Sequence, residues 1–295
     1  MRRRANEFGV PTQLLIAALL SLWLIVCLYP FAVVVGGSMT DESVLREGIS
    51  VIPREFSLDS YRLLLARPDR VMRAYQVTIF VTVAGTVLSV MVNAMMAYSI
   101  SRSTCRYRYQ LAFFAYFTML FSGGMVAWYI VMVNVLGLRN TVWGMIVPYL
   151  AHAWFLLILR AYFRSVPDDF ADSAKIDGAG ELRIFLQIFL PLSLPAIATI
   201  TLFTAMRYWN DWWLAIMLID HAELQPLQMM LRAVMSRVQF LASDMGHRAT
   251  DLGITLPSRA LRFATTVVTI GPIVFLYPFL QRYFIKGLTI GGIKG

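Results

Sequence analysis

The stretch that decides the fold is Val166-Pro-Asp-Asp-Phe-Ala-Asp-Ser-Ala-Lys-Ile-Asp-Gly-Ala-Gly-Glu-Leu-Arg-Ile-Phe-Leu-Gln-Ile-Phe-Leu-Pro191, which lies between two long apolar runs. We call residues 166–191 the polar segment. Its Pro-Asp-Asp start favours a helix, because acidic side chains in the first turn interact well with the helix dipole. We expect a short helix through Ala174, a break at Gly178 and a second short helix that ends before Pro191.

The apolar runs around the polar segment place the chain in a membrane. Its mean hydropathy is +0.65, and only 15% of its 295 residues are charged, against about a quarter in soluble domains. A spanning helix needs about 20 residues, and we expect six spans: Leu14–Val35, Val77–Ile100, Leu111–Val133, Val142–Phe163, Pro195–Ile219 and Phe263–Phe284. The sequence thus predicts an all-α polytopic membrane protein with six transmembrane helices. Its expected parts are a cytoplasmic N-terminus (1–13), a transmembrane domain (14–284) with an outer loop (220–262), and a cytoplasmic tail (285–295).

The formal net charge of +9 orients the protein rather than marking a nucleic-acid surface. The short outer loop between spans three and four holds only Arg139, whereas the short inner segments hold many basic residues. The two long outer segments hold others, but long loops translocate largely regardless of charge. This positive-inside bias predicts that both termini are cytoplasmic. The first apolar run is longer than the core of a signal peptide, which is about 7–15 residues, so we expect a retained span.

Two motifs carry a resemblance to a known family. Asp172-Ser-Ala-Lys-Ile-Asp-Gly-Ala179, followed by Ile188-Phe-Leu-Pro191, resembles the EAA loop of ABC-importer permeases. That pattern has a Glu-Ala-Ala start, a Gly, nine residues and Ile-x-Leu-Pro; Asp172 and Ser173 depart from its first two positions. The tail Gln281-Arg-Tyr-Phe-Ile-Lys-Gly-Leu-Thr-Ile-Gly-Gly-Ile-Lys-Gly295 is similar to the end of the second permease subunit of the maltose importer.

The resemblance implies a type I ABC-importer permease that lies in a bacterial inner membrane and translocates an oligosaccharide. It implies that the polar segment is a cytoplasmic coupling loop that contacts an ATPase through Asp172, Ser173, Ala174, Asp177, Gly178, Ala179, Ile188, Leu190 and Pro191. It also implies that the tail contacts the ATPase through Lys286, Gly287, Gly291 and Gly292. The implied partners are a second, non-identical permease, an ABC ATPase dimer that holds ATP and Mg, an extracytoplasmic solute-binding protein, and membrane lipid. No cofactor and no metal are expected on this chain, and nucleic acid is not expected to bind.

The end of span five is the candidate substrate pathway, with Arg207, Trp209, Asn210 and Asp211. Arg207 and Asp211 are four residues apart, a spacing that allows an ion pair on a helix. Aromatic rings beside charged and amide groups are also what sugar binding uses. The structural pair is our preferred interpretation, and an aromatic belt at the outer interface is the preferred one for the tryptophan.

Three further features inside the spans predict local structure. Small and weakly polar residues recur on one face of span two, at Thr82, Gly85, Ser89 and Asn93, and favour close helix packing over a pathway role. In span four the neutral imidazole of His152 is expected to satisfy a carbonyl that Pro148 frees. Ser122-Gly-Gly124 is expected to loosen span three near its middle.

Other classes of function are less consistent with the sequence. It contains no phosphate-binding loop, zinc-binding helix or nucleophile elbow, so we do not expect an enzyme. A secondary transporter not coupled to an ATPase is the alternative, but it would need coupling charges near mid-membrane and often two repeated halves. Both neutral and acidic oligosaccharides, among them alginate and pectin fragments, stay open as cargo.

Overall fold

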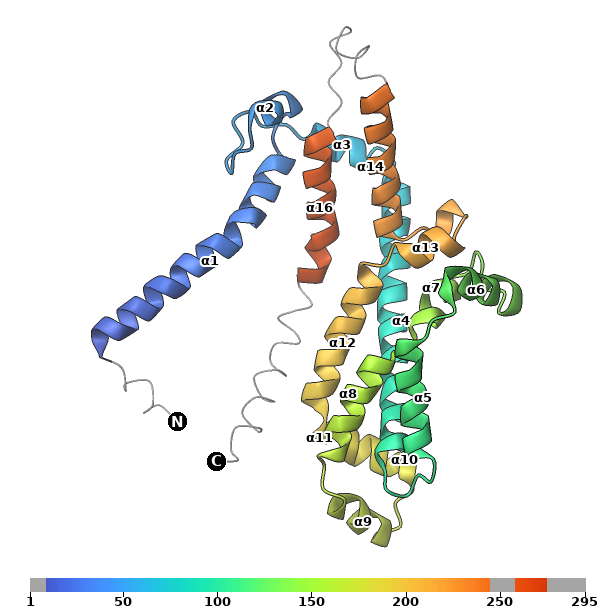
Figure 1. Ribbon diagram of the computed structural model, residues 1–295. Coiled ribbons are helices and arrows are strands. Elements are labelled where there is room, and N and C mark those ends of the chain that lie inside the picture. Colours follow the sequence, from blue (N-terminus) through green and yellow to red (C-terminus); the bar gives the residue numbers. More distant parts are fainter. Residues whose placement is uncertain (1–8, 245–257, 275–295) are drawn as a thin grey trace. The chain divides into compact units, whose positions relative to one another are not determined.

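Helices make up the regular structure of the parts that the computed structural model describes, residues 9–244 and 258–274 (Figure 1). In these ranges the only β-contact is an isolated bridge between Thr40 and Phe56. The chain forms two compact units: Met1–Arg67 with Leu231–Ile270, and Pro68–Met230 with Gly271–Gly295. We describe each unit separately. The predicted all-α class is confirmed.

The first unit begins with α1 (Val10–Ser38), which contains the predicted first span and whose long apolar side chains are largely exposed. The short helices α2 (Glu42–Glu47) and α3 (Asp59–Leu64) follow it. α14 (Leu227–Asp244) and α16 (Ser258–Val274) each begin or end in this unit. α1 and α16 approach closely, since a Cβ added to Gly37 would lie 2.6 Å from a ring carbon of Phe263.

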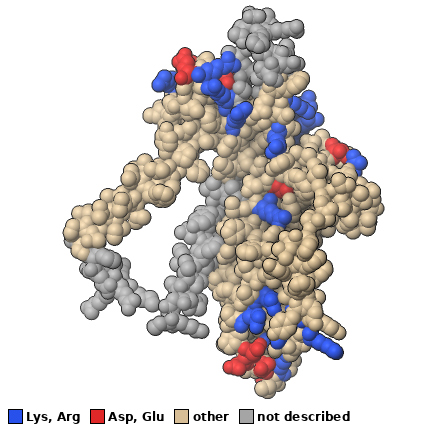
Figure 2. Space-filling model, viewed as in Figure 1, with Lys and Arg blue, Asp and Glu red and all other residues tan. Residues whose placement is uncertain are grey.

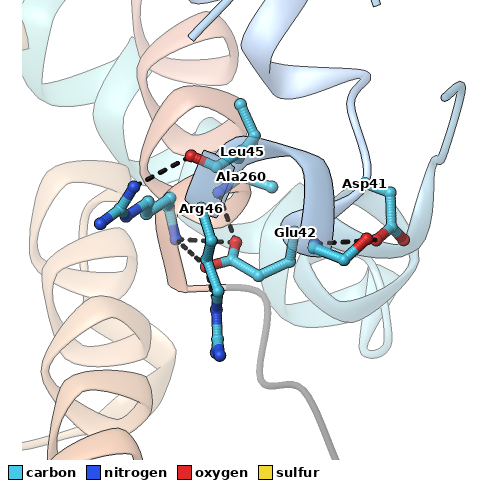
Figure 3. Close-up of polar contacts among 7 residues, drawn as sticks. Asp41, Glu42, Leu45, Arg46 and Ala260 are labelled. Atoms are coloured by element: carbon cyan, nitrogen blue, oxygen red, sulfur yellow. Dashed lines mark hydrogen bonds and ion pairs between the residues drawn. The ribbon is translucent and has the colours of Figure 1, made fainter. Parts of the chain in front are cut away.

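A buried carboxylate fastens α2 to the first turn of α16 (Figure 3). Glu42 is 4% exposed, and its oxygens accept the backbone N–H groups of Arg259, at 3.0 and 3.2 Å, and of Ala260, at 3.0 Å. The Arg259 guanidinium in turn donates to the carbonyl of Leu45 at 2.9 Å. Glu42 therefore satisfies N–H groups that a helix start leaves without a partner.

The second unit is built around α4 (Pro68–Ser101), which packs against α12 (Leu194–Trp209), α8 (Ala153–Arg164) and α5 (Arg108–Leu120). Figure 1 shows these four helices side by side. Thr82, Ser89 and Asn93 are buried, and a Cβ added to Gly85 would lie 2.7 Å from the Tyr208 ring of α12. The packing interpretation of this stripe is confirmed, because small side chains let the two helices approach.

Within residues 9–244 and 258–274, two helices, Pro11–Ser38 and Pro68–Ser101, are long and apolar enough to cross a membrane, and three bent helix pairs also qualify. Arg108–Leu120 and Gly124–Val135 meet at 117°, Trp143–Tyr149 and Ala153–Arg164 at 50°, and Glu181–Leu192 and Leu194–Trp209 at 84°. The first bend falls at Gly124, whose φ of 78° is left-handed, so the expected loosening at the glycine pair is a sharp bend. α16 covers only the start of the predicted sixth span, and its remainder lies outside the described residues.

Two predicted boundaries are wrong. Span five does not continue to Ile219, since α12 ends at Trp209 and α13 (Trp213–Leu218) starts anew. The second helix of the polar segment does not end before Pro191, because a wide π-turn, η3 (Phe185–Phe189), precedes the proline and the helix runs on through α11 (Leu190–Leu192). The wider turn lets the chain accommodate a residue that lacks an N–H.

The remaining elements complete the described ranges. They are α6 (Gly124–Ile130), η1 (Val131–Val135), α7 (Trp143–Ile146), η2 (Val147–Tyr149), α9 (Asp169–Ile176), α10 (Glu181–Ile184) and η4 (Ala222–Leu224).

Candidate coupling segment and substrate pathway

The polar segment forms a short helix, a left-handed turn and a second helix. α9 ends at Ile176, and Gly178 has a φ of 78°, a conformation that favours glycine. The N–H of Gly178 donates to Lys175 O at 3.0 Å, and the N–H of Ala179 donates to Ala174 O at 2.9 Å. The predicted break at Gly178 is confirmed.

One side of the polar segment is open. Among the predicted coupling residues, Asp172, Ser173, Asp177, Gly178 and Pro191 are exposed, and Ala174, Ala179, Ile188 and Leu190 are half-buried. Four large apolar side chains of the segment are also exposed: Phe170, Ile176, Leu182 and Leu186. Figure 2 shows acidic and basic side chains gathered at this end of the unit. Exposed apolar side chains rimmed by charge are typical of a protein-binding surface.

A small depression marks the same surface. Its volume is about 220 Å³, and it is lined by Ala174, Asp177, Ala179, Arg183, Ile184, Gln187 and Ile188. It therefore contains four of the predicted coupling residues.

The other side of the polar segment is part of the helical core. Ala171, Ile184, Phe185 and Phe189 are buried in one cluster with residues of α4 and α8, including Phe163. This apolar contact holds the exposed surface on the bundle.

In the candidate pathway, Tyr149 of η2 lies between the two charged residues. The guanidinium carbon of Arg207 is 3.8 Å from the centre of the Tyr149 ring. The Tyr149 hydroxyl donates to Asp211 Oδ1 at 2.9 Å. No ion pair among residues 9–244 and 258–274 includes Arg207. The expected Arg207–Asp211 pair is not formed, because α12 ends at Trp209 and the helical four-residue spacing no longer applies.

The other two candidates have different surroundings. Trp209 is 5% exposed, so its indole is packed inside the unit. Asn210 is exposed; its amide donates to Met206 O at 2.9 Å and its side-chain oxygen accepts from Gln228 at 3.3 Å. Asn210 therefore closes the end of α12 and ties it to α14.

Asn93 supports the break in span four. Its Nδ2 donates to Leu150 O at 2.8 Å, and its Oδ1 accepts the N–H of His152 at 3.0 Å. The His152 imidazole packs 4.5 Å from the Phe155 ring, and its Nδ1 is buried without a hydrogen-bond partner in the described residues. The prediction that this imidazole satisfies the carbonyl freed by Pro148 is wrong, since the described residues give the ring no hydrogen bond; the Asn93 amide instead satisfies the carbonyl of Leu150 at the break.

Sequence reasoning missed Tyr149, Tyr98 and Arg102, which contact these two sites. Tyr149 directly follows Pro148, and Arg102 is the first charged residue after span two, but neither position alone indicates a partner. The predicted tail residues lie outside the described residues. Within the described ranges no group of three or more His, Cys, Asp or Glu could hold a metal ion.

Bent, mutually packed spans with a protruding polar segment define this chain as a membrane permease. Residues 85–290 match the family described as "Binding-protein-dependent transport system inner membrane component", and the chain belongs to this family. The prediction of an ABC-importer permease is confirmed, and the alternative of a secondary transporter is not supported.

Relatives of the chain are sugar-importer permeases. It is 39% identical over 284 residues to the polygalacturonan/rhamnogalacturonan transport system permease protein YtcP of Bacillus subtilis, covering 96% of this chain and 98% of that protein. It is 27% identical over 285 residues to the trehalose/maltose transport system permease protein MalG of Thermococcus litoralis, covering 92% and 93%. The predicted similarity to maltose and uronate-oligosaccharide permeases is confirmed.

A solved structure agrees with this assignment. The chain superposes with a TM-score of 0.77, at 28% identity, on a chain of a bacterial ABC transporter involved in the import of the acidic polysaccharide alginate. The match covers 96% of this chain and 99% of that chain.

Proposed function

We propose that this permease subunit passes an acidic oligosaccharide, with Arg207 as a contact for the cargo's carboxylates. The observation that carries the proposal is the position of the guanidinium, which lies against the Tyr149 ring and not against Asp211. The similarity to a polygalacturonan/rhamnogalacturonan permease and to an alginate importer supports an acidic cargo.

The chemistry of the guanidinium supports this role. A cation within a span is costly, by at least about 2.5–3.5 kcal/mol at the centre, unless something offsets it. The Tyr149 ring stabilises the face of the guanidinium through a cation–π contact. The N–H groups lie in the guanidinium plane, and a carboxylate can accept two of them at once. The carboxylate of a uronate in the pathway could therefore accept hydrogen bonds from Arg207 N–H groups that do not pair with Asp211.

Uptake of two cargoes tests the proposal. In cells that express the whole transporter, Arg207→Gln should lower uptake of a galacturonate trimer. Any uptake of maltotriose that the unmodified transporter shows should stay unchanged in this variant. Arg106→Gln removes an exposed arginine outside the candidate pathway and serves as the control. Equal loss for both sugars, or no loss for either, would overturn the role of Arg207.

We further propose that the polar segment binds an ABC ATPase dimer, which holds ATP and Mg. The polar segment and both termini of the chain then lie on the cytoplasmic side of the membrane. Its exposed Phe170, Ile176 and Leu182 support a protein partner. A second, non-identical permease and an extracytoplasmic binding protein complete the proposed assembly, which the family membership supports. Purification of the tagged full chain from its own membranes should bring an ATPase with it, and its absence would contradict this assignment.

A further inference from the structure

Tyr98 in the last turn of α4, and Arg102 directly after that helix, hold the polar segment at two points. The Tyr98 hydroxyl donates to Glu181 Oε2 at 2.5 Å, and Arg102 Nη1 pairs with Asp168 Oδ1 at 2.6 Å. Asp168 precedes α9, and Glu181 is the first residue of α10. The two bonds therefore fix the starts of both short helices, on either side of the Gly178 turn.

The two side chains that donate these bonds are packed against buried aromatic rings. The Arg102 side chain is 5% exposed, and its guanidinium carbon lies 5.3 Å from the centre of the Phe189 ring. The Tyr98 ring packs against Phe185 and Phe189 at 5.2 and 5.0 Å. A charge-assisted bond with a buried partner is stronger and more strictly oriented than one between two exposed side chains.

Glu181 has a second partner within the polar segment. Its Oε1 accepts from Lys175 Nζ at 2.8 Å, while Tyr98 occupies its other oxygen. The carboxylate thus joins α9, α10 and α4 at one point. A movement of α9 or α10 therefore changes the geometry of the hydrogen bond between Glu181 and Tyr98.

The same helix holds the broken span beside the candidate pathway. Asn93 binds the backbone of Leu150 and His152, and the Ser89 hydroxyl donates to Tyr149 O at 3.2 Å. Asn93 and Tyr98 are about 7.5 Å apart along a helix that rises 1.5 Å per residue. α4 is continuous over this distance, so a shift at one end reaches the other without a hinge between them.

We propose that Tyr98 and Arg102 are positioning residues that transmit movement of the polar segment through α4 to the backbone that carries Tyr149. This inference rests on the proposed ATPase-binding function of the polar segment. Transmission requires that both sites bias the same element, and α4 is the described helix that binds both through side chains. Tyr98 and Arg102 act through their bonds to the polar segment and contact neither the cargo nor ATP.

The test uses the complete transporter in liposomes with its ATPase and binding protein, and a galacturonate trimer as the probe. The variants are Tyr98→Phe, which keeps the ring and removes the hydroxyl, Arg102→Gln, and Glu181→Gln alone and with Tyr98→Phe. Tyr107→Phe, at an exposed tyrosine, is the matched control. The readouts are bound ATPase, basal ATP hydrolysis and its stimulation by the loaded binding protein.

Tyr98→Phe and Arg102→Gln should each reduce the stimulation about tenfold, the size expected when a bond to a charged acceptor is lost, with bound ATPase and basal hydrolysis unchanged. The double variant should lose less than the sum of its two single losses, because both changes remove the Tyr98–Glu181 bond; Glu181→Gln adds only the weakened contact with Lys175. Normal stimulation in both variants, additive losses, or losses that follow the amount of bound ATPase would overturn the inference. If the unmodified chain binds no ATPase, the proposed function itself fails and this inference with it.

Discussion

The Glu42 carboxylate accepts the backbone N–H of Ala260 at 3.0 Å, across 218 positions of the sequence. This contact and the two to Arg259 make a side chain of α2 the cap of α16. A buried carboxylate is tolerated here because N–H groups and the positive end of a helix surround it. Glu42 thus links the segment after the first span to the start of the last one.

Glu42→Gln should destabilise the protein by about 1.5–3 kcal/mol, the contribution of hydrogen bonds to a charged group. The glutamine amide has one acceptor oxygen where the carboxylate has two, and its NH2 group would face the backbone N–H groups of α16. Thermal unfolding in detergent should show a lower midpoint than the unmodified chain. Glu47→Gln changes an exposed residue of the same helix and should leave the midpoint in place; equal shifts for both would refute the capping role.

Asn93→Leu should destabilise the second unit. The change leaves Leu150 O and the N–H of His152 without the Asn93 partner, and each unpaired buried group costs about 1–3 kcal/mol. Asn134→Leu, at an exposed asparagine of η1, is the control. The amount of folded protein in membranes and its unfolding midpoint measure the effect. A wild-type midpoint for Asn93→Leu would mean that water or another group replaces the amide.

Local signals explain which features could be predicted. The length of the apolar runs located the helices, and glycine located the bend at Gly124 and the turn at Gly178, since both have a left-handed φ. Small residues on one face of α4 identified its packing face, because they recur at helical spacing. Each of these features depends on neighbouring residues in the sequence.

The missed contacts depend on distant residues or on a helix end. Tyr149 and Asp211 are 62 positions apart, and Tyr98 and Glu181 are 83 positions apart. The expected Arg207–Asp211 pair failed because the sequence did not indicate that α12 stops at Trp209. The sequence therefore indicated that Arg207 and Asp211 lie near each other, but not that each of them contacts Tyr149.

Gly178→Val should impair ATPase binding and transport without preventing membrane insertion. An added Cβ at Gly178 meets nothing within 4 Å, so the cost comes from the backbone, whose φ of 78° disfavours a side chain by about 1–2 kcal/mol or more. Gly180→Val is a matched control, because its surroundings are equally open and its φ is −74°. Gly178→Asn should retain part of the activity, since asparagine tolerates the left-handed region.

Co-purified ATPase and cargo-stimulated hydrolysis measure this prediction. The expected order is unmodified chain and Gly180→Val first, then Gly178→Asn, then Gly178→Val. Normal stimulated hydrolysis in Gly178→Val would remove the turn from its proposed role.

An exchange of charges, Arg207→Asp with Asp211→Arg, should fail to restore what Arg207→Gln loses. The two side chains contact Tyr149 from different directions and do not pair with each other, so exchanging them recreates neither the cation–π contact nor the hydrogen bond. Loss of a guanidinium–carboxylate contact with the cargo should lower uptake of a galacturonate trimer about ten- to hundredfold. Uptake is compared at equal amounts of each variant in the membrane, with maltotriose as the neutral cargo. Restored uptake of both sugars by the exchange would show that the charges form a structural pair during transport, and Arg207 would then have no direct role in selecting an acidic cargo.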